Sequence, residues 1–270
     1  MSWTSLNDIA TIHGWYKADA ITGLNDGDLI SSVLDSSGLS RSLSASGSAR
    51  PTYKTGIVNG LPVMRFGTST HVLSSASFSL SAVQMSAVIA VKSATLLNYA
   101  GFVAVDDQSP NTSPATLLNC YAGADGKLWG EQTATAHRST DAAILTTGSW
   151  CILTFLAQSD YLAIRRNGRS YDMSGGVGIY ANKTGTFYTH IGNSSYGGSM
   201  SADCAEVVVF RETSLRESVW IEGYLANKYG ITLETGHLFK NAAPQSAPAT
   251  YNATGGSRLI NGGLVRGQVL

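Results

Sequence analysis

Hydrophobic residues along most of this chain occur in short runs, separated by clusters of Gly, Ser, Asn and Asp. This pattern is typical of β-strands joined by turns. Residues 87–91 and 150–156 are almost continuously apolar and rich in β-branched or aromatic side chains. Such runs are too short to suggest helices and predict central strands that are covered on both faces. We therefore expect an all-β protein built as a sandwich.

Two short segments predict tight turns between strands. Asn167 and Gly168 separate two strand-like runs, and both residue types tolerate the positive φ that a type I′ turn requires. Asp125 and Gly126 form a second turn candidate, which leads into Leu128. These turns predict hairpins but carry no functional information.

One segment has helical spacing instead. Over residues 214–229 apolar side chains recur four positions apart, as Leu215 and Val219 do. Ser214 and Glu217 have the spacing of a capping box, which marks a helix start. The segment predicts a single helix near the end of the sandwich.

The composition changes after about residue 235. Residues 241–250 are rich in Pro and Ala, as in a linker. We therefore divide the chain into a sandwich over residues 1–235 and a C-terminal arm over residues 236–270. The apolar residues of the arm are candidates for attachment to another protein by strand addition or groove insertion: Leu259, Ile260, Leu264, Val265, Val269 and Leu270.

The charge balance excludes several classes of partner. Only 13% of residues are charged and the formal net charge is zero, which disfavours a nucleic-acid binder because such proteins carry a basic excess. No apolar stretch approaches the roughly 20 residues of a membrane span, so we expect a soluble protein with no membrane partner. Low charge also suits a protein packed among neighbours.

The cysteines and the N-terminus indicate the compartment. Cys120, Cys151 and Cys204 are odd in number and widely spaced, so they predict buried free thiols rather than a disulfide framework. The first residues lack a basic segment followed by an apolar run, so no secretory signal is expected. Both features predict synthesis in a reducing cytoplasm.

Catalytic patterns are missing from the sequence. Retaining glycoside hydrolysis needs two carboxyl groups about 5–5.5 Å apart, and no strand carries an alternating row of acids; Glu206 stands alone in its strand. The five histidines are scattered and no nucleophile motif is present. We expect no enzymatic activity and assign no catalytic residue.

Two kinds of binding site stay open as alternatives. Exposed aromatic side chains could hold a sugar, and the candidates are Tyr121, Trp129, Tyr188 and Tyr196; burial in the core is the alternative for each. Calcium needs six to eight gathered oxygens, and the candidate carboxylates are Asp26 with Asp28, or Asp106 with Asp107. Solvated loop acids explain these residues equally well, so no cofactor or metal is assigned.

The order of several motifs resembles the concanavalin A-like, laminin G-like family of jelly-roll sandwiches. The motifs span residues 10–232 and comprise residues 14–19, 35–38, 49–53, 59–66, 191–194, 205–210 and 221–230. The resemblance implies a jelly-roll β-sandwich with one helix near its end. It is specific for fold and weak for activity, because one fold hosts many functions.

The resemblance also implies a setting for the protein. Members with this pattern are often phage virion proteins, so we expect a virion structural subunit: a capsid decoration, head-fibre, collar or tail accessory protein anchored through its arm. Its partners would be other virion proteins and copies of itself, a trimer being one form. The alternative is a glycan-binding adhesion module that recognises a host-surface polysaccharide.

Overall fold

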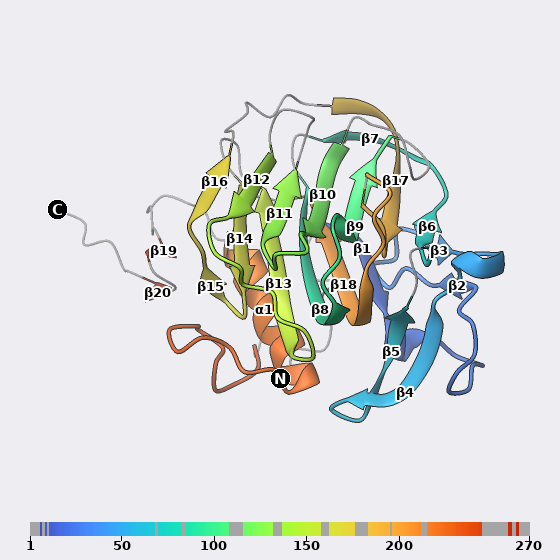
Figure 1. Cartoon of the computed structure of the whole chain (residues 1–270), viewed down its shortest axis with the longest axis horizontal. Coiled ribbons are helices and arrows are strands. Elements are labelled where there is room, and N and C mark those ends of the chain that lie inside the picture. Colours follow the sequence, from blue (N-terminus) through green and yellow to red (C-terminus); the bar gives the residue numbers. More distant parts are fainter. Residues whose placement is uncertain are drawn as a thin grey trace.

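A computed structural model describes residues 6, 9, 11–67, 70–82, 85–107, 116–131, 137–157, 162–175, 183–194, 196–211, 215–244, 259–260 and 263–264. These residues form two large antiparallel sheets that face each other across a hydrophobic core, together with one α-helix (Figure 1). The predicted all-β sandwich is confirmed. Within the described ranges, no helix is long and apolar enough to cross a bilayer.

The first sheet has eight strands: β1 (Ile12–Lys17), β4 (Thr52–Val58), β5 (Leu61–Phe66), β8 (Ser86–Thr95), β13 (Trp150–Ala157), β14 (Leu162–Arg166), β15 (Arg169–Ser170) and β18 (Ser201–Phe210). They run in the order β15-β14-β13-β8-β18-β5-β4, and β1 also pairs with β18. The two apolar runs in the sequence are therefore neighbouring central strands, because β8 lies between β13 and β18.

The second sheet has ten strands: β2 (Ser32–Val33), β3 (Leu43–Ser44), β6 (Leu73–Ser75), β7 (Phe78–Ala82), β9 (Ala100–Asp106), β10 (Thr116–Ala122), β11 (Leu128–Glu131), β12 (His137–Thr140), β16 (Met173–Gly175) and β17 (Lys183–Ile191). Their order is β16-β12-β11-β10-β9-β17-β6-β3-β2, with β7 added against β17. Two short 3₁₀ turns, η2 (Ala18–Ala20) and η3 (Gly47–Ala49), lie in the connections.

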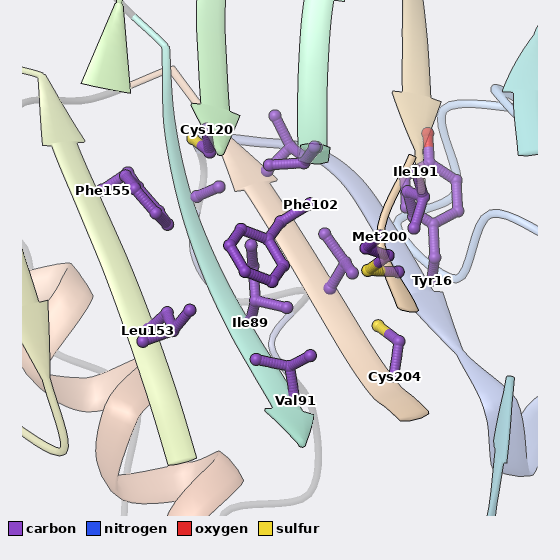
Figure 2. Close-up of a cluster of buried hydrophobic side chains, with 14 of the residues drawn as sticks. Tyr16, Ile89, Val91, Phe102, Cys120, Leu153, Phe155, Ile191, Met200 and Cys204 are labelled. Carbon is purple, nitrogen blue, oxygen red and sulfur yellow. The ribbon is translucent and has the colours of Figure 1, made fainter. Parts of the chain in front are cut away.

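The main core fills the space between the two sheets. Alternate residues of β8 and β13, such as Ile89 and Phe155, point from the first sheet toward Phe102 of the second (Figure 2). Side chains alternate between the faces of a strand, so the remaining residues of β8 and β13 point the other way. Continuous apolar runs therefore require a second apolar cover.

Helix α1 (Leu215–Tyr229) supplies that cover on the outer face of the first sheet (Figure 1). Its Ile221 and Leu225 pack in one cluster with Val88, Ala90 and other outward-facing strand residues. The predicted helix is confirmed, whereas the proposed cap Ser214 lies outside the described residues. Helix α1 packs on the eight-stranded sheet and not on the outer face of the ten-stranded sheet.

A buried ion pair joins α1 to the sheet beneath it. The Arg165 side chain donates from Nε to Oε1 of Glu222 over 2.8 Å, and His237 Nε2 lies 2.9 Å from Oε2. Thr154 donates its hydroxyl to the same carboxylate over 2.7 Å. All four side chains are buried, so the contact fixes the helix, β13, β14 and the segment after the helix in one arrangement.

The predicted turns have the expected backbone. Asn167 and Gly168 have φ of 50° and 82°, as a type I′ turn demands, and Gly126 has φ of 79°. A further hairpin of this kind, at Asn59 and Gly60 with φ of 47° and 74°, joins β4 to β5. This Asn-Gly pair is also visible in the sequence, at the start of the motif of residues 59–66.

The three cysteines lie on central strands of both sheets. Cys120 is in β10, Cys151 in β13 and Cys204 in β18, and all three are buried free thiols as predicted. Figure 2 shows Cys120 and Cys204 among the buried side chains of the main core.

Only short parts of the C-terminal arm are described. Two-residue strands, β19 (Leu259–Ile260) and β20 (Gly263–Leu264), pair with each other in antiparallel fashion. The other predicted anchor residues, Val265, Val269 and Leu270, lie outside the described residues.

Candidate functional site

A groove opens at one rim of the ten-stranded sheet, where three loops meet. The loops join β8 to β9, β10 to β11 and β17 to β18. The groove has a volume of about 650 Å³, and its lining residues are Asn98, Tyr99, Tyr121, Gly123, Ala124, Asp125, Trp129 and Tyr196. We call this set the aromatic groove, because four of its eight residues are aromatic. Its volume falls within the range of about 300–1,000 Å³ typical of small-molecule sites.

The inner wall of the aromatic groove is a pair of parallel rings. Tyr121 of β10 and Trp129 of β11 are direct cross-strand partners, and their ring planes differ by 5° with centroids 6.0 Å apart. Their strand neighbours Cys120 and Leu128 point into the core between the sheets, so the two rings stand on the opposite, outer face. Tyr121 is buried and Trp129 is half-buried.

Two exposed tyrosines complete the aromatic cluster. The ring of Tyr99 lies 5.4 Å from that of Tyr196 and 5.8 Å from that of Tyr121, measured between centroids. Tyr196 meets Tyr121 edge to face at 5.7 Å. Tyr99 is 52% exposed and Tyr196 is 46% exposed. The groove therefore presents aromatic surface to solvent instead of hiding it in the core.

Two glycines bring the loops close enough for this cluster to form. The Gly101 amide donates to the carbonyl of Gly198 over 2.9 Å. A Cβ at Gly101 would lie 1.9 Å from the nitrogen of Ser194, and one at Gly198 would lie 2.1 Å from the carbonyl oxygen of Tyr99. Both positions therefore exclude side chains, and this close contact sets Tyr196 beside Tyr99.

A buried carboxylate holds Tyr196 in place. The Tyr196 hydroxyl donates to Oε1 of Glu131 over 2.7 Å, and the side-chain amide of Asn119 donates to Oε2 over 3.3 Å. Glu131 and Asn119 are both buried. Burial, together with the hydrogen bond and negative charge of Glu131, raises the pKa of the Tyr196 phenol well above its usual value, so Tyr196 stays a neutral donor at physiological pH.

The lip of the groove carries polar groups from two loops. The Asn98 side-chain oxygen accepts the Ala124 amide over 3.3 Å, and Asp125 Oδ1 accepts the Lys127 amide over 3.1 Å. A Cβ at Gly123 would come within 2.5 Å of that same Asp125 oxygen. Glycine at this position therefore leaves room for the Asp125 carboxylate at the lip.

Three of the four aromatic residues singled out in the sequence meet in this groove: Tyr121, Trp129 and Tyr196. The fourth, Tyr188, lies elsewhere on β17, where its ring stacks on His190 with centroids 6.1 Å apart. Tyr99 belongs to the groove but carried no sequence signal, because its place depends on the distant loop that contains Gly198.

A second polar arrangement lies on the same outer face. His190 Nδ1 is 2.8 Å from the Ser74 hydroxyl, and its Nε2 is 3.4 Å from Oδ1 of Asp106. These residue types also form hydrolase triads, in which the serine meets Nε2 and the acid meets Nδ1. Here the two nitrogens have the reverse partners and the imidazole is buried, so the arrangement is that of a cross-strand polar contact.

The remaining candidate carboxylates have structural partners. Asp26 pairs with Lys54 and accepts the Thr55 amide over 2.9 Å, while Asp28 accepts the Asn25 amide over 2.7 Å. Among the residues that the structure describes, no three His, Cys, Asp or Glu side chains gather as metal ligands would.

The strand of Glu206 carries a second acid, contrary to the sequence prediction: β18 also contains Asp203, which forms ion pairs with Arg65 and Lys92. Glu206 itself has structural partners. It is fully buried and accepts hydrogen bonds from Trp15 and from the Tyr229 hydroxyl, the latter over 2.7 Å. Lys228 Nζ lies 2.7 Å from the same carboxylate.

Comparison with known proteins supports the fold. No family model and no curated protein matches the sequence. The receptor-binding domain of botulinum neurotoxin D is similar over 80% of this chain and 52% of that chain, with a TM-score of 0.53 and 10% identity. A Trypanosoma rangeli sialidase in complex with sialic acid is similar over 81% of this chain, with a TM-score of 0.48 and 12% identity. A Ruminococcus gnavus sialidase CBM40 module bound to sialyllactose is similar over 58% of this chain and 92% of that one, with a TM-score of 0.43 and 10% identity.

The similarity to the neurotoxin domain confirms the predicted concanavalin A-like sandwich. This chain spans only about a third of the Trypanosoma rangeli sialidase, since 33% of that chain is covered. At identities this low the similarity establishes the fold alone. Any function has to be argued from the aromatic groove itself.

Proposed function

We propose that this chain is a non-enzymatic glycan-binding module that recognises a cell-surface polysaccharide through the aromatic groove. The observation that carries the proposal is the convergence of four aromatic side chains on one solvent-open groove, with polar groups at its lip. They come from two strands and two loops, so the cluster is not a consequence of one aromatic-rich segment.

The chemistry of this lining suits a sugar ring. A pyranose has apolar C–H faces and a polar edge of hydroxyls, so it needs flat apolar surface beside hydrogen-bonding groups. Tyrosine and tryptophan rings supply the flat surface and add a polar atom. Asn98, Asp125 and the Tyr99 hydroxyl supply donors and acceptors at the lip.

Replacing a groove aromatic tests this proposal. We expect Trp129→Ala and Tyr99→Ala to weaken binding to a glycan identified on an array by about tenfold or more, equivalent to about 1.4 kcal/mol. Titration calorimetry on the full chain measures the loss. Tyr188→Ala is the matched control, because it removes an outer-face tyrosine that does not line the groove.

Two results contradict the proposal. One is the absence of saturable binding by the assembled protein to any glycan on a broad array. The other is a glycan affinity that Trp129→Ala and Tyr99→Ala leave unchanged while both variants keep native far-ultraviolet circular dichroism and the native midpoint of thermal unfolding.

A second proposal concerns where the module is displayed. We propose that the arm attaches the sandwich to a phage particle, so that the chain is a virion structural protein. Together with glycan binding by the groove, this would make the chain a host-attachment subunit. Support comes from the linker-like composition after residue 240 and from the apolar Leu259, Ile260 and Leu264 in the β19–β20 pair. A chain ending after Pro244 should fold but fail to co-purify with particles; normal incorporation would reject the arm as the anchor.

A further inference from the structure

We propose that the aromatic groove selects uncharged sugar rings and rejects sialic and uronic acids, an inference that rests on glycan binding at this groove. Recognition of an acidic sugar needs a cation or several aimed donors to hold its carboxylate. Among the described residues that line the groove there is no Lys, Arg or His, whereas Asp125 contributes a carboxylate.

The position of the Asp125 carboxylate makes its charge effective at the lip. Its Oδ1 is held by the Lys127 amide at 3.1 Å, so the group is fixed by the turn between β10 and β11. Its Oδ2 has no hydrogen-bond partner within the described part of the chain, and the residue is exposed. That oxygen is suited to accept a hydrogen bond from a sugar hydroxyl. A ligand carboxylate in the same position would be repelled by its negative charge.

Within the described lining, no cation offsets the Asp125 carboxylate. The nearest basic residue along the chain, Lys127, is half-buried and does not line the groove. Asp125 is therefore the one charged group among the described residues that line the groove, and its negative charge is tolerated by a neutral glycan but not by an anionic one.

The test is an array printed with matched glycans, each neutral oligosaccharide beside its sialylated and glucuronylated forms. We expect the native chain to bind a neutral member and to bind its acidic forms at least tenfold more weakly. Asp125→Asn keeps an oxygen for the Lys127 amide but removes the charge. It should therefore reduce the difference in affinity between the neutral and the acidic glycans, and Asp125→Lys should reduce this difference further. Asp172→Asn, an exposed acid that does not line the groove, is the control.

The possible outcomes separate the proposed selectivity from the proposed glycan binding. Equal or stronger binding of the acidic forms by the native chain overturns the selectivity and leaves glycan binding standing. An unchanged preference in Asp125→Asn and Asp125→Lys also overturns it, because the carboxylate would then play no part. Failure of every glycan to bind rejects the proposed function itself.

Discussion

At the scale of single residues, the most consequential side chain outside the groove is Glu222. Burial alone raises the pKa of this carboxyl, but the charge of Arg165 and the hydrogen bond from His237 outweigh burial and lower the pKa to about 2. A buried pair of this kind adds little stability over an apolar pair, yet breaking one partner is expensive because the other is left alone.

We expect Glu222→Gln to lower the free energy of unfolding by about 3–5 kcal/mol at pH 7, since Arg165 would remain buried without its counter-charge. Urea denaturation followed by tryptophan fluorescence measures the change. Glu234→Gln, an exposed acid, should stay within about 0.5 kcal/mol of the native chain. Equal losses in both variants would show that the buried pair has no special role.

The same residue predicts a pH dependence. The folded pKa of Glu222 lies below its ordinary value of 4.5, so its contribution is complete above pH 4.5 and disappears as the pH falls toward 2. The difference amounts to about 3 kcal/mol. Unfolding measured between pH 5 and 2 should show this loss in the native chain and less of it in Glu222→Gln; parallel curves would contradict the assignment.

Residue-scale features of the groove were partly accessible from the sequence. The predicted turn at Asp125 and Gly126 reverses the chain, so residues equally far before and after the turn face each other across the two strands. Tyr121 and Trp129 are such a pair. Tyr99 was beyond reach, because its position depends on the contact between Gly101 and Gly198, which are far apart in the chain.

Tyr188 shows the converse limit of sequence analysis. It faces the same side of the sheet as Tyr121, but Tyr121 pairs with Gly101 of β9 whereas Tyr188 pairs with Asp106. Five residues along β9 correspond to roughly 17 Å along the strand direction, so the two rings lie far apart. Strand register, which hydrophobic pattern alone does not define, decides which aromatic residues share a site.

At the scale of elements, helix α1 explains why the central strands are apolar on both faces. The sequence predicted that the central strands are covered on both faces, and it also predicted the helix. It did not show that the helix is what covers one of those faces. Nothing in the spacing of residues 214–229 says which sheet the helix covers. The consequence is an asymmetric sandwich, with one outer face sealed by α1 and the other carrying the groove at its rim.

We expect Leu225→Ala to lower the free energy of unfolding by about 2–5 kcal/mol, because this side chain is fully buried between α1 and the first sheet. Asn227→Ala, exposed on the same helix, should change it by less than about 0.5 kcal/mol. Thermal or urea unfolding measures both. If Leu225→Ala is as stable as Asn227→Ala, the helix does not contribute to the core in the way described.

At the scale of the whole molecule, the sandwich continues past its helix. Ile231, Leu233 and His237 are buried against the rest of the chain, and His237 contacts the Glu222 carboxylate. These contacts pack the segment after α1 against the sandwich. The sequence placed the boundary near residue 235 from composition, so Ile231 and Leu233 lie within the predicted sandwich and His237 lies just after the boundary.

Two truncations locate the boundary of the stable unit. A chain ending after Pro244 should unfold with the same free energy as the full chain, within about 0.5 kcal/mol. A chain ending after Gly230 should lose about 3 kcal/mol or more, because it removes the burial of Ile231 and Leu233 as well as the His237 contact. Equal stability of the two truncations would show that residues 231–244 add nothing to the fold.

The three buried cysteines can report when the sandwich opens, because they lie on central strands of both sheets. Burial raises the pKa of all three thiols, that of Cys151 to about 11, and a maleimide reacts only with an accessible thiolate. Labelling kinetics in native buffer therefore time the moments at which each sheet exposes its interior. One shared rate for Cys120, Cys151 and Cys204 means that the sandwich opens as a unit, whereas early modification of Cys120 means that the sheet bearing the groove loosens by itself.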